Sequence, residues 1–107
     1  MFDLFRYQTE DGRQPFTEWL ESIQDKTAQA KLRVRLRRLE AGLFGDCEPV
    51  GDGVLELREH LGAGCRIYFG RQGRTVVILL TGGTKRTQSS DIELAKKYWA
   101  DWKRRKP

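Results

Sequence analysis

The sequence predicts an α+β domain with the order β-α-α-β-β-β-α: a small antiparallel-rich sheet, an N-terminal helical hairpin and a C-terminal helix. Apolar residues recur at helical spacing between positions 15 and 43. Between positions 54 and 80 the pattern changes to short apolar runs separated by glycine-rich turns, which is typical of strands. No repeat, linker or low-complexity segment interrupts the 107 residues, so we expect one domain over residues 1–107.

The N-terminal segment should form a strand and a short helix. Residues 2–8 show the mixed alternation of a strand, and a turn follows at residues 10–13. Pro15 stands where a helix accepts proline, at its first residue. Apolar residues then follow at helical spacing, which predicts an amphipathic helix over residues 15–23.

A second helix should begin between Asp25 and Thr27 and end near Gly42 or Gly45. Its basic residues fall on the faces away from the apolar stripe, as expected for a helix packed on a core. The two helices should form a hairpin. The stripe consists of Ala28, Leu32, Leu36, Leu39 and Leu43.

Three strands should follow, at residues 54–60, 65–69 and 74–80. The links between them are a glycine-rich turn at residues 62–64 and a hairpin turn at residues 70–73. Consecutive strands joined by such short links predict an antiparallel meander.

The meander should lead into the last helix. Val76–Leu80 is entirely apolar, which predicts a central strand buried on both faces. Gly82 and Gly83 should let the backbone turn after it. A Ser-x-x-Glu capping box at Ser90 should start the helix. Its apolar side should comprise Ile92, Ala95, Tyr98 or Trp99, and Trp102.

Charge is unevenly distributed along the chain. Lysine and arginine number 20 against 15 acidic residues, and the net charge is +5. Residues 26–45 and residues 96–107 each contain six basic residues and one acidic residue. Such clusters favour a polyanionic partner, nucleic acid or an acidic protein segment, although a solvated helix face has the same composition.

Several classes of protein do not fit this composition. No segment approaches the ~20 apolar residues of a membrane span, and the start lacks the pattern of a signal peptide. Cys47 and Cys65 lack metal-site spacing, and we interpret them as reduced thiols rather than a disulfide. We therefore expect a cytoplasmic protein without a metal or another cofactor.

The predicted strand order should gather cations at one edge of the sheet: Arg58, His60, Arg66, Lys85 and Arg86. Arginine binds phosphate through a bidentate fork, and a lysine near arginines loses its proton more readily. RNA cleavage needs a base for the ribose 2′-OH and cations for the charge that develops on the phosphate. A basic surface without catalytic function would show the same residues.

Four segments together resemble the RelE/ParE superfamily of bacterial toxins, and most closely the phage Gp49-like, HigB-type addiction module killer proteins. The likeness runs through nearly the whole chain in order. Its most specific parts, taken together, are the Glu-Leu-Arg, Arg-Ile-Tyr and Gly-Gly-x-Lys-x-x-Gln-x-x-Asp-Ile motifs. The segments are YQTEDGRQPFTEWL (7–20), VLELRE (54–59), GCRIYF (64–69) and LLTGGTKRTQSSDIELA (79–95).

The resemblance implies a RelE-like fold, a tightly bound antitoxin and toxicity to the producing cell. Many such toxins are endoribonucleases that cut mRNA in the ribosomal A site. By this resemblance Arg66 stabilises the phosphate, Arg58 matches the arginine of the preceding strand, and Lys85 is either the base or a second charge stabiliser. Arg86 has weaker support, because the family often has a small or polar residue at its position.

The chain also departs from the family pattern. The C-terminal tyrosine or histidine found in several RelE-like active sites has no clear counterpart, and we interpret Tyr98 and Trp99 as core residues. His60 is the only histidine. It would act as acid or base if it faced the cluster, and otherwise it is an exposed residue at a strand end. Cys65 stands where this group often has an aromatic residue, and we interpret it as a small core substitution.

Two other functions remain open at this point. One is a ParE-type toxin, which inhibits DNA gyrase and is not an enzyme. The other is a module that binds nucleic acid or a partner without catalysis. For the basic segments we expect ribosomal RNA contacts at Arg33, Arg37 and the tail Lys103–Lys106, with docking of an acidic antitoxin segment as the alternative use.

Overall fold

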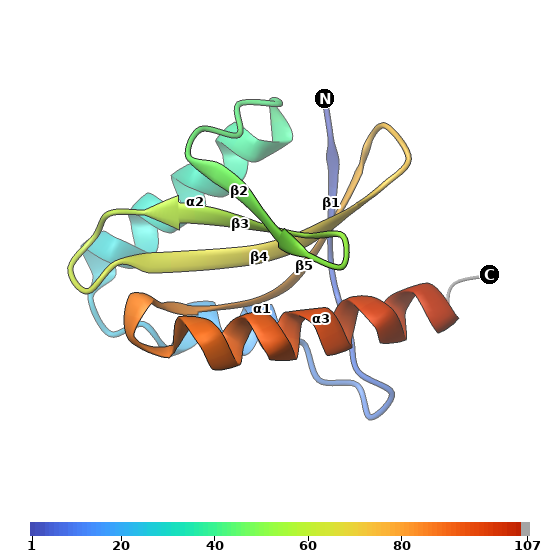
Figure 1. The fold of residues 1–107 in the computed structure, drawn as a ribbon. Coiled ribbons are helices and arrows are strands. Elements are labelled where there is room, and N and C mark those ends of the chain that lie inside the picture. Colours follow the sequence, from blue (N-terminus) through green and yellow to red (C-terminus); the bar gives the residue numbers. More distant parts are fainter. Residues whose placement is uncertain (106–107) are drawn as a thin grey trace.

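The computed structural model describes residues 1–105 and contains one five-stranded sheet in the order β1-β5-β4-β3-β2 (Figure 1). Only β1 and β5 run parallel, and every other neighbouring pair is antiparallel. The predicted α+β class is therefore confirmed, with one more strand than expected. The elements are β1 (Asp3–Arg6), α1 (Pro15–Ser22), α2 (Lys26–Glu40), β2 (Cys47–Gly51), β3 (Val54–Glu59), β4 (Cys65–Gln72), β5 (Val76–Thr84), the 3₁₀ turn η1 (Lys85–Thr87) and α3 (Gln88–Arg105).

Helices cover both faces of the sheet, with α3 in front and α1 and α2 behind in the view of Figure 1. Leucines of α2 and Phe16 of α1 pack on one face against Ile67 and Phe69 of β4. On the other face Trp99 of α3 packs against Tyr68. No helix within residues 1–105 is long and apolar enough to cross a membrane.

The helix signals in the N-terminal half are largely confirmed. Pro15 is the first residue of α1. The side chain of Asp25 caps α2 by accepting hydrogen bonds from the backbone N–H groups of Thr27 and Ala28, at 2.9 and 3.2 Å. The expected stripe fails at Leu43, which is 63% exposed, because α2 ends at Glu40 and the chain turns away.

The antiparallel meander of β3, β4 and β5 is confirmed, but two of its strands are longer than predicted. Gly70, expected in a turn, lies within β4, where the ring of Trp99 approaches to 2.6 Å of the place that a Cβ would occupy. The run Val76–Leu80 is flanked by strands on both sides and almost entirely buried, as predicted. The sequence analysis did not predict β2, whose Pro49 and polar neighbours give no strand signal.

Gly82 and Gly83 lie inside β5, so the predicted turn at this pair is wrong. Because the two glycines have no side chain, other residues can pack closely against each face of β5 at these positions. A Cβ at Gly82 would collide with the ring of Trp19 on α1, and one at Gly83 would collide with the carboxylate of Asp91 on α3. The chain turns instead in η1, and α3 begins at Gln88 rather than at the predicted capping box.

Candidate functional site

Two arginines stand side by side on the face of the sheet that α3 covers. The register pairs Arg58 of β3 with Arg66 of β4, and Arg66 in turn with Gly83 of β5. Directly paired residues of neighbouring strands point to the same face, with Cα atoms about 5 Å apart. Val54 has the same parity as Arg58 and packs with α3, which identifies this face.

Lys85 joins the arginines through the turn between β3 and β4. Its backbone N–H donates a 2.8 Å hydrogen bond to the carbonyl oxygen of Gly64. A Cβ built at Gly64 would lie 3.4 Å from Nη1 of Arg66 and 3.5 Å from Cβ of Lys85. The guanidinium and the base of the lysine side chain therefore flank the same glycine. The structure thus brings together Arg58, Arg66 and Lys85, which we call the cationic site.

Arg66 is a buried cation with few partners. Its exposed fraction is 6%, and its Nη1 donates a 3.2 Å hydrogen bond to the carbonyl oxygen of Cys65. Its Nε has no hydrogen-bond partner among residues 1–105, and no carboxylate of that part of the chain lies within 4.0 Å of its guanidinium. A desolvated cation with no carboxylate in direct ion-pair contact is costly, so this position favours an anionic ligand.

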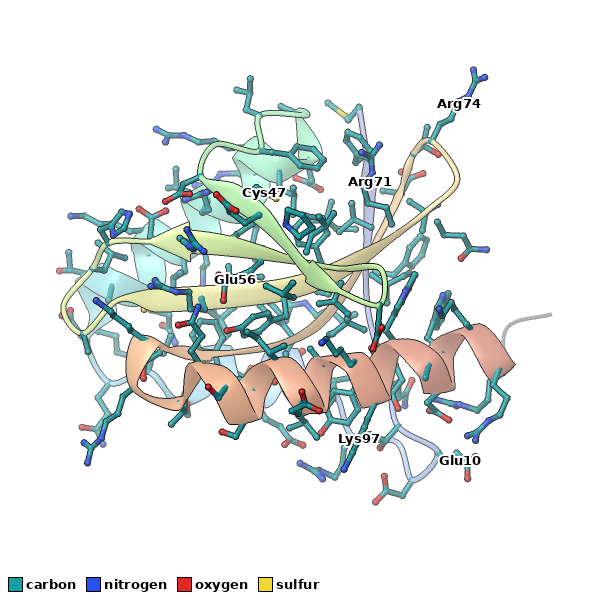
Figure 2. The ribbon with its side chains drawn as sticks, in the orientation of Figure 1. Glu10, Cys47, Glu56, Arg71, Arg74 and Lys97 are labelled. Atoms are coloured by element: carbon teal, nitrogen blue, oxygen red, sulfur yellow. The ribbon has the colours of Figure 1, made fainter. Side chains whose placement is uncertain are left out.

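A fully buried carboxylate, Glu56, holds Arg58 in place (Figure 2). Arg58 Nε donates to Glu56 Oε1 at 2.9 Å. The hydroxyl of Tyr68 and the side-chain amide of Gln88 donate to Glu56 Oε2 at 2.9 and 2.8 Å. Because Gln88 is the first residue of α3, these bonds also tie the start of the helix to the sheet. Since Arg58 Nε is engaged and Nη1 lies 4.0 Å from Oε1 of Glu48, a ligand would meet the outer nitrogens of the guanidinium beside a second carboxylate.

The hydrogen bonds decide the ionisation of Glu56. Burial acts to raise its pKa, but the bonds from Gln88, Arg58 and Tyr68 together outweigh burial and hold the pKa below its usual range. The neighbouring phenol responds in the opposite direction, because burial and the bond to Glu56 raise the pKa of Tyr68. Glu56 is therefore a carboxylate at neutral pH.

We expect Glu56→Gln to destabilise the protein by about 2 kcal/mol at pH 7, since the amide cannot pair with Arg58. The lowered pKa of Glu56 means that its stabilisation is present above the ordinary carboxyl pKa of about 4.3 and is lost as the pH falls through the lowered value. The difference in the free energy of unfolding between wild type and variant should therefore become smaller below pH 4. Urea unfolding at pH 7 and pH 3 measures both values. The exposed Glu93 provides the control Glu93→Gln, which should match wild type at both pH values. An equal difference in the free energy of unfolding at pH 7 and pH 3 would show that the ionised carboxylate of Glu56 is not the cause.

Two of the predicted binding residues lie near the site in sequence but not in contact with it. Arg86 follows Lys85 in η1 and is exposed. His60 follows β3, and its Nε2 lies 3.2 Å from Oδ2 of Asp46. It lines a hollow of about 410 Å³ on the side of α2, together with Arg38. The structure therefore places His60 at an exposed strand end.

The expected ribosomal RNA contacts lie elsewhere on the molecule. Arg33 and Arg37 are exposed on α2, which covers the face opposite to the cationic site. Lys103 lies near the C-terminal end of α3, with its Nζ 5.6 Å from the ring centre of Trp99. Lys106, part of the same prediction, lies outside the described residues. A polyanion that contacts these residues as well as the cationic site must therefore extend over more than one face of the protein.

Glu56, Tyr68 and Gln88 were not predicted as residues of the site. A signal for Glu56 was present, because residues two apart in a strand share a face, and Glu56 stands two positions before Arg58. An acidic residue in an otherwise apolar strand, beside a cation on the same face, indicates a buried ion pair. Gln88 gave no such signal, because its partner lies 32 positions away.

Comparison with known proteins places the chain in a family. The model of the phage-derived Gp49-like proteins (DUF891) matches residues 18–100, which include β3, β4, β5 and all three residues of the cationic site. A protein of Haemophilus influenzae (strain Rd), described as an uncharacterized protein, is 46% identical over 81 residues. The match covers 76% of this chain and 82% of the relative. The chain therefore belongs to the Gp49-like family of phage-derived proteins.

Proposed function

We propose that this protein is the toxin of a toxin–antitoxin pair and that it inhibits translation by cutting mRNA on the ribosome. The observation that carries the proposal is the buried Arg66, with its unpartnered Nε, flanked by Arg58 and Lys85. A phosphodiester is an anion of the size and charge that such a site can hold through charge-assisted hydrogen bonds. The resemblance to RelE-type toxins supports the same substrate.

The RNA itself supplies the nucleophile in this reaction. A base removes the proton of a ribose 2′-OH, and the resulting oxygen attacks the adjacent phosphorus. The bond to the 5′-oxygen breaks, this oxygen takes up a proton, and a 2′,3′-cyclic phosphate and a 5′-hydroxyl remain. Arg66 and Arg58 would stabilise the negative charge that develops on the phosphate, which is often the largest single contribution to catalysis.

The remaining partners belong to the same proposal. The exposed arginines Arg33 and Arg37 and the C-terminal Lys103 would contact ribosomal RNA, and the ribosome would help to arrange the mRNA at the cationic site. A cognate antitoxin would bind the toxin in a hetero-oligomer in the cytoplasm and neutralise it.

The test is radiolabelled amino-acid incorporation within minutes of inducing the wild-type chain or Arg66→Ala. We expect incorporation to fall with the wild type and to stay near the uninduced level with the variant, and new mRNA ends with 5′-hydroxyls to appear only with the wild type. Growth arrest with DNA breaks and normal incorporation would instead indicate a ParE-type gyrase inhibitor. Normal growth together with normal incorporation would indicate that the protein is a binding module without catalytic activity.

Lys85→Arg separates the two roles of this lysine. The side chain of Lys85 is exposed beside the guanidinium of Arg66, a position from which either a lysine or an arginine can stabilise charge on a phosphate. We therefore expect Lys85→Arg to keep cleavage within about tenfold of wild type and Lys85→Ala to lower it about a hundredfold. Cleavage rates on purified ribosomes measure both. Equal losses in the two variants would identify Lys85 as the base.

A further inference from the structure

The open edge of the sheet at β1 carries a surface that RNA cleavage does not use. Within residues 1–105, β1 pairs with β5 alone. The N–H groups of Asp3 and Tyr7 point toward β5 and donate to the carbonyl oxygens of Thr75 and Leu79, at 2.7 and 2.9 Å. Backbone groups alternate in direction along a strand. The N–H and C=O groups of the even-numbered residues of β1, Leu4 and Arg6, therefore point outward from the sheet.

Two adjoining hollows follow this edge, one of about 570 Å³ and one of about 510 Å³. They share Phe5 of β1 and Trp102 of α3, so they form one continuous depression, which we call the β1 groove. The first hollow extends past Leu4 and Arg6, and the second extends to the β4–β5 hairpin, where Arg74 projects (Figure 2). The groove therefore runs beside the outward-facing backbone groups.

Two aromatic side chains, Phe5 and Trp102, line the β1 groove. Phe5 is 53% exposed, a large fraction for an aromatic side chain on a strand. Nε1 of Trp102 is buried and has no hydrogen-bond partner among residues 1–105. The aromatic surface that a ligand can contact in the β1 groove is therefore the ring of Phe5, together with the part of Trp102 that lines both hollows.

The rim of the β1 groove is positively charged. The described residues that line the two hollows include Arg6, Arg74 and Arg105 and no carboxylate. Arg6 donates to the hydroxyl of Thr17 rather than to an acid, and Arg105 alone is paired, with Asp101. The surface therefore favours an acidic ligand and disfavours a second copy of this chain, which would bring the same arginines together.

The geometry points to the β1 groove as the docking site for an extended acidic segment of a partner protein, which adds to the sheet as a sixth strand. Its backbone would pair with Leu4 and Arg6, and an apolar side chain would lie on Phe5 and Trp102. Single-stranded RNA could stack on the same aromatic rings but would leave the strand edge unpaired. The inference stands independently of RNA cleavage.

A synthetic peptide of alternating glutamate and valine, Glu-Val-Glu-Val-Glu-Val-Glu with blocked ends, is the probe. Its binding to the intact chain is followed by NMR through backbone amide exchange and the Trp102 indole proton. We expect exchange to slow at the amides of Leu4 and Arg6, and the indole signal to shift. A peptide of the same sequence with N-methyl groups on alternate residues should bind at least tenfold more weakly, because it cannot pair with the edge.

Two charge reversals provide the matched variants. Arg6→Glu with Arg74→Glu should weaken peptide binding at least tenfold, while Lys31→Glu with Arg38→Glu on α2 should leave it unchanged. Equal binding of the N-methylated peptide, or no binding of either peptide, would overturn the inference. So would protection of the Leu4 and Arg6 amides that depends on protein concentration without peptide, which would indicate a second copy. Tighter binding of an RNA heptamer with shifts at Phe5 would assign the groove to nucleic acid instead.

Discussion

Replacing Arg66 with lysine is expected to lower the rate of mRNA cleavage about a hundredfold, although the positive charge is retained. Arg66 extends from the interior of β4 and is 6% exposed, so the shape of its fork decides which nitrogens face the phosphate. Lysine is a compact and strongly hydrated charge with no second donor in fixed geometry. Burying it also costs more solvation than burying a guanidinium. The measurement is the single-turnover rate on ribosomes carrying a defined mRNA, at saturating protein.

Arg71→Lys is the matched control. Arg71 lies in the same strand, but it is exposed and its guanidinium stacks on the rings of Phe2 and Phe44, at 4.9 and 5.3 Å. This variant should cleave at the wild-type rate, and thermal unfolding should show that both variants are folded. If Arg66→Lys kept more than half of the wild-type rate, a bidentate contact between Arg66 and the phosphate would be ruled out.

The part of the site that sequence reasoning could locate depends on short connections. β3, β4 and β5 follow one another through tight turns, so they must pair as antiparallel neighbours. The end of β3, the start of β4 and the end of β5 then lie at the same end of the sheet, independently of the other elements. This placed Arg58, Arg66 and Lys85 together. His60 lay in the same short segment, yet its side chain turned to Asp46, because direction beyond a strand end depends on local packing.

The remainder of the fold depends on contacts between distant segments. β1 pairs in parallel with β5, more than seventy positions away, and no local pattern encodes that partner. β2 pairs only with β3 and lies at the other edge of the sheet, where polar residues and Pro49 are tolerated. Its pairing with β3 gives it the form of a strand, and no pattern in its own residues indicates that pairing.

The glycine pair shows how a local preference can mislead. Gly-Gly commonly marks a turn, and Ser90 with Glu93 has the spacing of a capping box. In the structure Gly82 and Gly83 are strand residues whose missing side chains admit Trp19 and Asp91, and Ser90 lies inside α3, where its hydroxyl donates to the carbonyl oxygen of Thr87. The need for glycine came from two helices that approach the strand from opposite faces.

Gly82→Ala is consequently expected to destabilise the protein by about 3 kcal/mol, the upper part of the usual range for an overpacked core. An alanine in a strand would ordinarily stabilise slightly, because it restricts the unfolded chain, so a large loss must come from the folded state. The added methyl group would meet the ring of Trp19, which lies between α1 and the sheet. Urea unfolding measures the change. Gly73→Ala serves as the control: its Cβ meets no atom within 4 Å, and only its positive φ of 62° should cost about 1 kcal/mol.

A second substitution at position 19 tests the cause. Trp19→Leu removes the ring that the methyl group would meet, at the cost of some apolar contact with the core. If the collision is the cause, Gly82→Ala should cost about 1 kcal/mol or less in the Trp19→Leu background, and the two changes should show a coupling energy of about 2 kcal/mol. Additive effects would instead place the strain in the backbone of β5. β5 also aligns Gly83 with Arg66, so a collision that displaces β5 should disturb the cationic site. Gly82→Ala should therefore lower the rate of RNA cleavage as well as the stability. The double variant Gly82→Ala, Trp19→Leu should recover both.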